Sequence, residues 1–226
     1  MSIYENILSV RNRIEEAAKR SGRGLEEITF VAVTKNQPIT AVAEVIEAGI
    51  SDIGENRAQE FLRKHEAITS KVNWHFIGHL QRNKVRYIIP FTYLVQSVDS
   101  IALAKEIDKR ASMIGKVQDV LLEVNVSGEA SKYGFSPQKV PAIVDELASL
   151  GYTHIKGLMM MAPFVEDIEV LRPYFAKLKE LFDNLTRRQE PNVEMRYLSM
   201  GMTNDFEVAI EEGSTMVRIG TALFKA

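Results

Sequence analysis

The chain has 226 residues, of which 46% are hydrophobic and 26% are charged, as in an ordinary globular protein. Its 28 basic and 30 acidic side chains give a formal net charge of -2, which argues against a broad nucleic-acid or anionic-membrane surface. The absence of cysteine excludes disulfides, thiolate catalysis and cysteine metal sites. No signal peptide or apolar run of the ~20 residues that span a bilayer is found, so we expect a cytoplasmic protein.

The first predicted element is a helix over residues 1–20, in which Ile3, Ile7, Val10 and Ile14 recur near helical spacing. A regular alternation of short apolar runs and helical segments follows. The predicted strands are 28–33, 52–55, 73–78, 93–98, 117–126, 154–161, 194–200 and 215–220. The predicted helices are 40–49, a polar stretch around His65, 100–115, 137–151, 167–189, 205–213 and a short segment after the last strand.

Strands that are joined through helices should be parallel and covered on their outer face, which suits runs that are apolar rather than alternating. Eight such units predict an α/β fold, a single (β/α)8 TIM-type barrel with an extra N-terminal helix. An open doubly wound sheet has the same alternation, and the count of units does not exclude it. No Pro-, Gly- or Ser-rich linker divides the chain, so residues 1–226 are expected to form one domain.

The stretch "FVAVTKNQPI" (30–39) places a lysine, Lys35, directly after an uninterrupted apolar strand. In both candidate folds the ligand site lies at the carboxyl ends of the strands, so Lys35 should be at the ligand end. A lone lysine at such a place commonly extends into solvent. A partly desolvated lysine, however, can act as a nucleophile towards a carbonyl group.

The loops after the last two strands have the composition of an anion site. Ser199, Gly201 and Thr203 precede one helix, and Gly220 and Thr221 precede the next. Glycines let backbone N–H groups approach an oxyanion, hydroxyl groups add donors, and barrels commonly bind phosphate between these two loops. Ordinary helix capping by the same residues is the alternative.

Arg218 lies inside the last predicted strand, where a charge is costly unless it is paired. We expect it to be a fixed hydrogen-bond donor that faces the ligand. Together, Lys35 and a phosphate site predict a ligand with both an aldehyde and a phosphate. Pyridoxal 5'-phosphate and the phosphorylated sugars of class I aldolases both meet this description, and the residues alone leave the two open.

Several longer motifs occur in order along most of the chain. They are "FVAVTKNQP", "DIGENRAQE", "WHFIGHLQRNK", "VNVSGEASKYGF", "GLMMMAP" and "LSMGMTNDFEVAIEEGSTMVRIGTALF". With these motifs the chain resembles the pyridoxal phosphate homeostasis protein family. Members of that family are similar to the N-terminal barrel domain of alanine racemase, the fold type III of pyridoxal phosphate enzymes.

The resemblance implies that Lys35 holds pyridoxal 5'-phosphate as a Schiff base and that Arg218 lies by the pyridine nitrogen. The residues implied to hold the phosphate are Ser199, Gly220 and Thr221, with the turn Gly201, Met202 and Thr203. Asn56 is expected near the ring, with Met160 and His79 in the wall. Lys132 matches a second family lysine linked to cofactor binding or transfer, with a solvated loop lysine as the alternative.

From the same resemblance we expect that this chain is not a racemase. Alanine racemase has a second domain and a catalytic tyrosine from its partner subunit, whereas this chain ends at Ala226 after the eighth unit, and none of its tyrosines stands in that enzyme's motif. A cofactor without a positioned second acid or base cannot carry out two-base proton transfer.

The implied function is therefore to buffer pyridoxal 5'-phosphate or to deliver it to transient partners, the apoenzymes that depend on it. Such a protein would affect vitamin B6 and amino-acid balance without robust turnover. No catalytic residues are assigned, no metal is expected because metal-ligand spacing is missing, and a monomer is favoured. The alternatives are a pyridoxal phosphate-dependent racemase or lyase and, more remotely, a Schiff-base aldolase.

Overall fold

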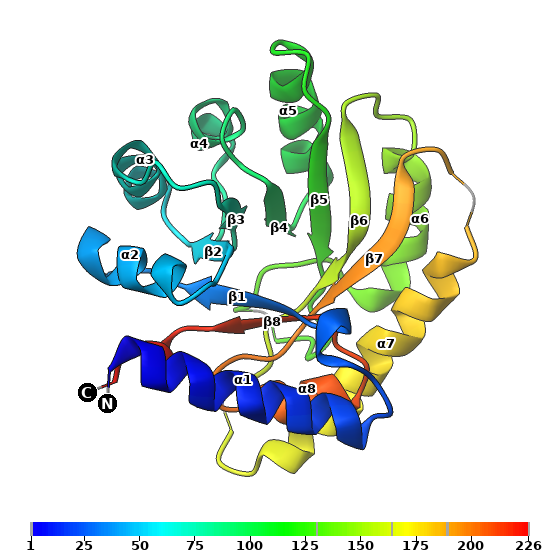
Figure 1. Cartoon of the computed structure of the whole chain (residues 1–226). Coiled ribbons are helices and arrows are strands. Elements are labelled where there is room, and N and C mark those ends of the chain that lie inside the picture. The colour runs from blue at the N-terminus through cyan, green and yellow to red at the C-terminus, as the bar shows by residue number, and fades with distance from the viewer. Residues whose placement is uncertain (1, 130, 164, 189, 226) are drawn as a thin grey trace.

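The computed structural model describes residues 2–129, 131–163, 165–188 and 190–225. Eight parallel strands form a closed barrel in chain order, and the barrel closes where the first strand pairs with the last (Figure 1). The predicted TIM-type barrel is therefore confirmed, and the open doubly wound sheet is wrong. Met1, Gln189 and Ala226, which bound predicted segments, lie outside the described residues.

The predicted strands agree with the structure to within a few residues at each end. The strands are β1 (Thr29–Val33), β2 (Asp52–Glu55), β3 (Asn73–Phe76), β4 (Leu94–Val98), β5 (Gln118–Glu123), β6 (Thr153–Met159), β7 (Val193–Ser199) and β8 (Met216–Ile219). Their short, mostly buried apolar runs are typical of a parallel barrel whose outer face is covered by helices.

The helices alternate with these strands. They are α1 (Ile3–Arg20), α2 (Ile39–Glu47), α3 (Ala58–Ala67), α4 (Arg82–Ile88), α5 (Ile101–Ser112), α6 (Val140–Leu147), α7 (Arg172–Thr186), α8 (Phe206–Glu211) and α9 (Thr221–Phe224). Short 3-10 turns precede β1, α6 and α7. The predictions missed α4, because seven residues are too few to show a helical period.

The extra N-terminal helix, α1, lies across the outside of the barrel and packs against α2, α8 and α9 (Figure 1). It begins with a capping box, in which Ser2 and Glu5 each accept a backbone N–H of the other. The buried Asn6 side chain donates to the carbonyls of Leu223 and Lys225. The helix therefore holds the end of the chain beside the closing strands β1 and β8.

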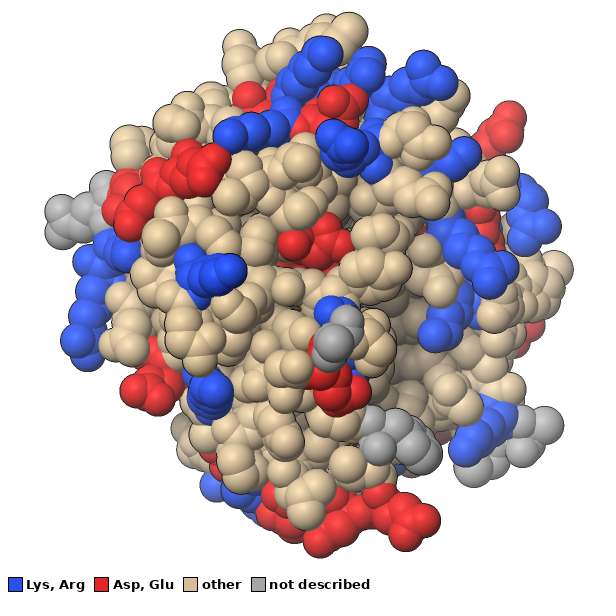
Figure 2. Space-filling view, turned by 180° about the vertical axis from the view of Figure 1, so that it is seen from behind, with Lys and Arg blue, Asp and Glu red and all other residues tan. Residues whose placement is uncertain are grey.

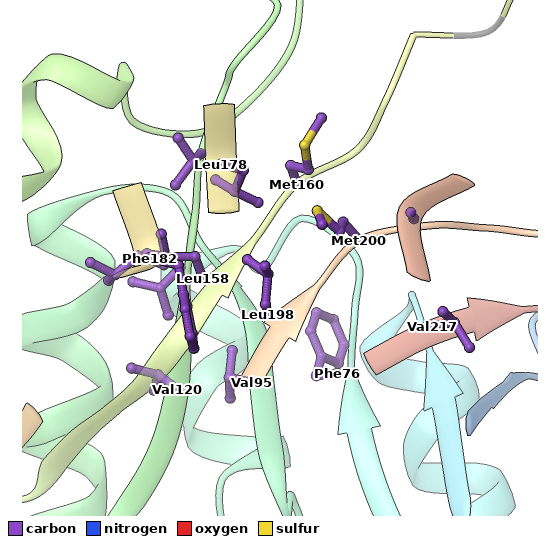
Figure 3. Close-up of a cluster of buried hydrophobic side chains, with 14 of the residues drawn as sticks. Phe76, Val95, Val120, Leu158, Met160, Leu178, Phe182, Leu198, Met200 and Val217 are labelled. Atoms are coloured by element: carbon purple, nitrogen blue, oxygen red, sulfur yellow. The ribbon is translucent and has the colours of Figure 1, made fainter. Parts of the chain in front are cut away.

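Alternate residues of each strand enter two different apolar clusters, because successive side chains point to opposite faces. Leu158 and Leu198 point outward and pack near Leu178 and Phe182 of α7 (Figure 3). The inward-facing cluster inside the barrel is much smaller. It consists of Val31, Leu94, Leu121, Met159, Tyr197 and Met216.

The rest of the barrel interior is polar. His75, Gln96, Ser199 and Arg218 are buried there, at inward positions of β3, β4, β7 and β8. Buried polar groups are costly unless they are hydrogen-bonded, so this interior indicates a built site rather than a simple core. No helix among the described residues is both long and apolar enough to cross a membrane.

Candidate functional site

A cavity of about 510 Å³ opens at the carboxyl ends of the strands. Residues from opposite ends of the sequence meet in it, as expected for a barrel of this type. The predicted site residues that line the cavity are Lys35, Asn56, His79, Met202, Thr203, Arg218, Gly220 and Thr221. The predicted residues that support it from outside its lining are Met160, Ser199, Gly201 and Lys132, and each is described below.

Lys35 follows β1 in a tight turn at the mouth of the barrel. Val33 faces the cavity, Thr34 points outward and is buried, and Lys35 again lines the cavity. The next residue, Asn36, has a left-handed backbone (φ 62°), a conformation that asparagine tolerates better than most residues. This turn stops the strand and leaves the Lys35 amine at the cavity, with its side chain exposed.

Arg218 is the buried cation of the site. Its Nη1 donates to Ser199 Oγ at 2.6 Å and its Nη2 donates to the Met160 carbonyl at 2.8 Å. Burial lowers the pKa of Arg218 to about 10, and the nearby Asp205 and Glu123 oppose that shift. The guanidinium therefore remains charged at neutral pH, as the prediction of a fixed donor required.

A chain of hydrogen bonds runs from Arg218 through the barrel. Ser199 Oγ donates to Gln96 Oε1 at 2.7 Å, Gln96 Nε2 contacts His75 Nδ1 at 2.9 Å, and His75 Nε2 contacts Asp52 Oδ1 at 3.0 Å. With the amide of Gln96 donating, the ring proton of His75 lies on Nε2 and is donated to Asp52. Although burial raises it, hydrogen bonding to His75 holds the pKa of Asp52 below its usual value. The chain thus ends on a carboxylate.

Two predicted residues contact Arg218. Ser199 is fully buried and its hydroxyl is engaged by Arg218 and Gln96. The Met160 side chain points into the outer core, and only its carbonyl reaches Arg218 (Figure 3). The structure therefore places both residues beneath the cavity rather than in its wall.

Gly201 supports the site through its backbone. Its carbonyl accepts the Arg218 N–H at 3.0 Å, and its φ of +94° lies in the region that favours glycine. An added Cβ would lie 2.7 Å from the Cβ of Ala209, too close for a real side chain. A glycine is therefore required where the loop after β7 passes over β8.

The loops after β7 and β8 lie together, as predicted for an anion site. The Gly220 N–H points to Thr203 Oγ1 at 3.4 Å, and both residues line the cavity. Asp205 accepts the Met202 N–H in the turn before α8. Burial raises the pKa of Asp205, opposed by that hydrogen bond and by Arg218. Neither α8 nor α9 begins with a side-chain cap hydrogen bond, so the structure does not support helix capping as the role of these loops.

Lys132 lies in the loop after β5, with its amine 3.0 Å from Glu129. Its neighbour Tyr133 lines the cavity and stacks on His79, with ring centroids 3.9 Å apart. His79 Nδ1 in turn lies 2.8 Å from Asp99 Oδ2. The loop that carries Lys132 thus covers one side of the cavity through the adjacent tyrosine.

The sequence predictions missed three of these polar residues: Glu123, Asp99 and Tyr133. Glu123 is 6% exposed and sits at the inward-facing end of β5, within the cavity lining. A carboxylate at the end of a buried strand was the available signal, as it was for Arg218. Burial raises the pKa of Glu123 to about 7, with Asp99 adding to the shift and Arg218 and His79 opposing it.

The cavity has the donors for a phosphorylated aldehyde. Lys35 supplies an amine, and the loops after β7 and β8 bring the hydroxyl groups of Thr203 and Thr221 together. In addition, the buried Asn56 Oδ1 has no hydrogen-bond partner among the described residues although Asn56 lines the cavity. Such an orphaned polar atom fits a site that is completed by a polar ligand. The residues present therefore fit pyridoxal 5'-phosphate.

One face of the molecule shows how the charges are distributed on it. On the face shown in Figure 2, acidic and basic side chains both occur, interspersed among uncharged residues. This mixture agrees with the formal net charge of -2.

Comparisons with known proteins show the family of the chain. The sequence model of the family described as "Alanine racemase, N-terminal domain" matches residues 6–226. The pyridoxal phosphate homeostasis protein of Aquifex aeolicus is 46% identical over 225 residues, which cover 99% of this chain and 98% of the relative. The solved structure of PipY from Synechococcus elongatus PCC7942 with pyridoxal phosphate bound superposes with a TM-score of 0.86 at 31% identity, covering 99% of this chain and 100% of PipY.

Alanine racemase from Clostridium difficile shares the fold alone, with a TM-score of 0.77 at 15% identity. All of this chain, but only 59% of the racemase chain, is covered by that match. The barrel and its cavity thus define an alanine-racemase-type N-terminal barrel. Within that class, the chain belongs to the pyridoxal phosphate homeostasis protein family.

The raised pKa of Glu123 predicts a pH-dependent stability. A carboxyl group with a pKa of about 7 when folded and about 4.5 when unfolded stabilises the protein below pH ~4.5, and this contribution is lost as the pH rises through 7. The difference in unfolding free energy between Glu123→Gln and the parent should therefore shift in favour of the variant by roughly 2 to 3 kcal/mol from pH 4.5 to pH 8. Urea unfolding of both proteins across this range measures the difference.

Glu44→Gln, at an exposed position of α2, is the control and should show the same pH dependence as the parent. If Glu123→Gln also follows the parent curve at every pH, Glu123 does not titrate near neutrality in the folded protein.

Proposed function

We propose that this chain carries pyridoxal 5'-phosphate as a Schiff base on Lys35 and serves to buffer or deliver it inside the cell. The observation that carries the proposal is the meeting of the Lys35 amine, the charged Arg218 and the paired loops after β7 and β8 in one cavity. The bound cofactor of PipY, at 31% identity over nearly the whole chain, supports the same assignment.

Each of these groups makes a different contact with the cofactor. Lys35 supplies the nucleophilic amine for the aldehyde. Thr203, Gly220 and Thr221 supply donors for the phosphate, and Asn56 contacts the ring. Arg218 lies by the pyridine nitrogen, where a guanidinium cannot accept the proton of a pyridinium, so the ring stays unprotonated and withdraws electrons weakly.

The proposed recipients are apoenzymes that depend on pyridoxal phosphate, met transiently by a monomeric, cytoplasmic protein. The names of the relatives, pyridoxal phosphate homeostasis proteins, support a regulatory task. A change in cofactor supply would then reach vitamin B6 and amino-acid metabolism. Lys132, in the loop that brings Tyr133 over the cavity, is a candidate for assisting the transfer.

A racemase or lyase is the second candidate, and one observation favours it. Glu123, Tyr133 and the His79–Asp99 pair bring acid and base groups to the same cavity as Lys35. An acid or base accelerates proton transfer only when it is within hydrogen-bond reach of the reacting proton. We favour the carrier because relatives 46% and 41% identical to this chain are named pyridoxal phosphate homeostasis proteins.

Replacement of Lys35 tests the attachment. Lys35→Ala should lose the visible absorbance band that the parent gains with pyridoxal 5'-phosphate, because no amine remains in that position to form the conjugated imine. Borohydride reduction of the parent, followed by peptide mass mapping, should place the adduct on Lys35. Lys105→Ala, which removes an exposed lysine of α5, should keep the band. A Lys35→Ala protein with an unchanged spectrum would refute the attachment.

Removal of the Ser199 hydroxyl tests the support of Arg218. Ser199→Ala should weaken cofactor retention by about tenfold, since a hydrogen bond to a charged group contributes about 1.5 kcal/mol or more. Equilibrium titration at the visible band measures the dissociation constant. The matched control is Ser214→Ala, another buried serine whose hydroxyl donates to backbone carbonyls. Equal affinities of the two variants would show that Ser199 has no special part in binding.

Proton exchange at an amino acid separates the carrier from the enzyme. We expect the loaded protein to exchange the α-proton of L-alanine in D2O far more slowly than the ~1 s⁻¹ at the low end of ordinary enzyme turnover. Loss of the α-proton signal in NMR measures the rate. Exchange at an enzymatic rate that disappears in Lys35→Ala would establish catalysis and overturn the carrier assignment.

A further inference from the structure

A second lysine, Lys64 of α3, is buried completely between the helix and the barrel. Its Nζ donates to the Thr34 carbonyl at 2.6 Å, to Glu55 Oε1 at 2.7 Å and to Glu60 Oε1 at 2.8 Å. An ammonium group has three N–H donors, so these contacts satisfy all of them. A buried charge with every donor paired indicates a specific requirement at this place.

All three acceptors lead to the turn that carries Lys35. The Thr34 carbonyl belongs to the peptide group on the amino side of Lys35, and Thr34 Oγ1 donates to Glu55 Oε1. On the carboxyl side, the Asn36 N–H donates to Glu60 Oε1 at 2.7 Å. Lys64 therefore bonds both carboxylates that contact this turn. Glu60 accepts from the left-handed Asn36, and Glu55 accepts from the buried Thr34.

The pKa values of the two carboxyl groups, Glu55 and Glu60, shift in opposite directions. Burial raises the pKa of Glu55, with the contacts from Lys64 and Thr34 opposing the shift. Glu60 is nearer to solvent. Burial also disfavours its charge, but hydrogen bonding to Lys64 prevails and holds the pKa of Glu60 below its usual value. Removal of Lys64 would thus leave two carboxylates and a buried carbonyl without their shared cation.

We propose that Lys64 is a positioning residue, which fixes the backbone on both sides of Lys35 and thereby aims the Lys35 amine into the cavity. This inference rests on the proposed function, since it assigns Lys64 a part in the attachment of the aldehyde to Lys35. The network lies outside the barrel, on the opposite side of the strands from the Arg218 chain. It holds the nucleophile without entering the cavity.

The simpler alternative is that Lys64 only stabilises the packing of α3. Cofactor affinity and the pH profile of the Schiff base distinguish the two, because a purely structural lysine would change the unfolding free energy and leave both quantities as they were. Lys64→Met keeps the approximate length of the side chain and removes the ammonium group. Lys116→Met is a matched control.

Lys116 is a partly buried lysine. Like Lys64, it donates to the backbone, here to the carbonyls of Ile89 and Thr92, both at 2.6 Å. It precedes β5 and therefore lies at the amino end of the barrel, away from the cavity. Its replacement removes two hydrogen bonds from an ammonium group to backbone carbonyls without touching the Lys35 turn.

The experiment is a titration of each protein with pyridoxal 5'-phosphate at the visible band, repeated from pH 6 to pH 10. We expect Lys64→Met to bind roughly tenfold more weakly, a loss of ~1.4 kcal/mol, and to show a displaced pH profile. Lys116→Met should match the parent in both measurements. A Lys64→Met protein with the affinity and pH profile of the parent would overturn the inference.

If Lys64→Met does not fold, Glu60→Ala keeps the inference testable. Glu60 lies near the surface, with a side chain 12% exposed, and its removal takes away the acceptor of the Asn36 N–H. We expect the same direction of change, with Glu66→Ala, exposed on the same helix, binding as the parent does. Equal binding by Glu60→Ala and Glu66→Ala would count against the inference. Failure of the proposed function would instead appear in the parent, as the absence of a Lys35 adduct.

Discussion

The buried guanidinium of Arg218 is the constraint on which the rest of the site depends. A charge inside a barrel is tolerated only when its donors are paired, and here Ser199 and the Met160 carbonyl accept from it. Ser199 must then be held in turn, which explains the polar chain through Gln96 and His75 to Asp52. These hydrogen-bonded side chains occupy much of the barrel interior. Most of the apolar packing therefore lies between the barrel and the helices.

The site is supported from both faces of the same strands. On the inner face, the hydrogen bonds to Ser199 and the Met160 carbonyl orient the Arg218 cation, which lines the cavity. On the outer face, Lys64 and Glu60 form hydrogen bonds to the backbone on either side of Lys35. This division follows from the alternation of side chains along a strand, since Val33 faces the cavity while Thr34 points outward. A cofactor site can thus be held rigidly by residues that never touch the cofactor.

The chain shares its fold with alanine racemase but belongs to the pyridoxal phosphate homeostasis protein family. The shared barrel accounts for the common placement of the cavity at the carboxyl ends of the strands. It does not decide between catalysis and storage, because function resides in the site rather than in the fold. The acid and base groups around His79 and Glu123 make proton exchange the decisive property to measure.

The sequence by itself determined the alternation of strands and helices, the ligand end and the groups with the clearest chemistry, whereas the pairing of β1 with β8 that closes the barrel was seen only in the structure. The alternation of apolar runs and helices is a local pattern, and Lys35 and Arg218 were conspicuous because each places a charge at a buried strand. Only the tertiary structure decided that Ser199 lies beneath Arg218 rather than in the cavity wall, and that Glu123, Asp99 and Tyr133 belong to the site. The same holds for Lys64, which the sequence shows as one polar residue in a polar helix. Its burial depends in part on a contact with Thr34, 30 positions away, and such a distant contact leaves no periodic mark on the chain.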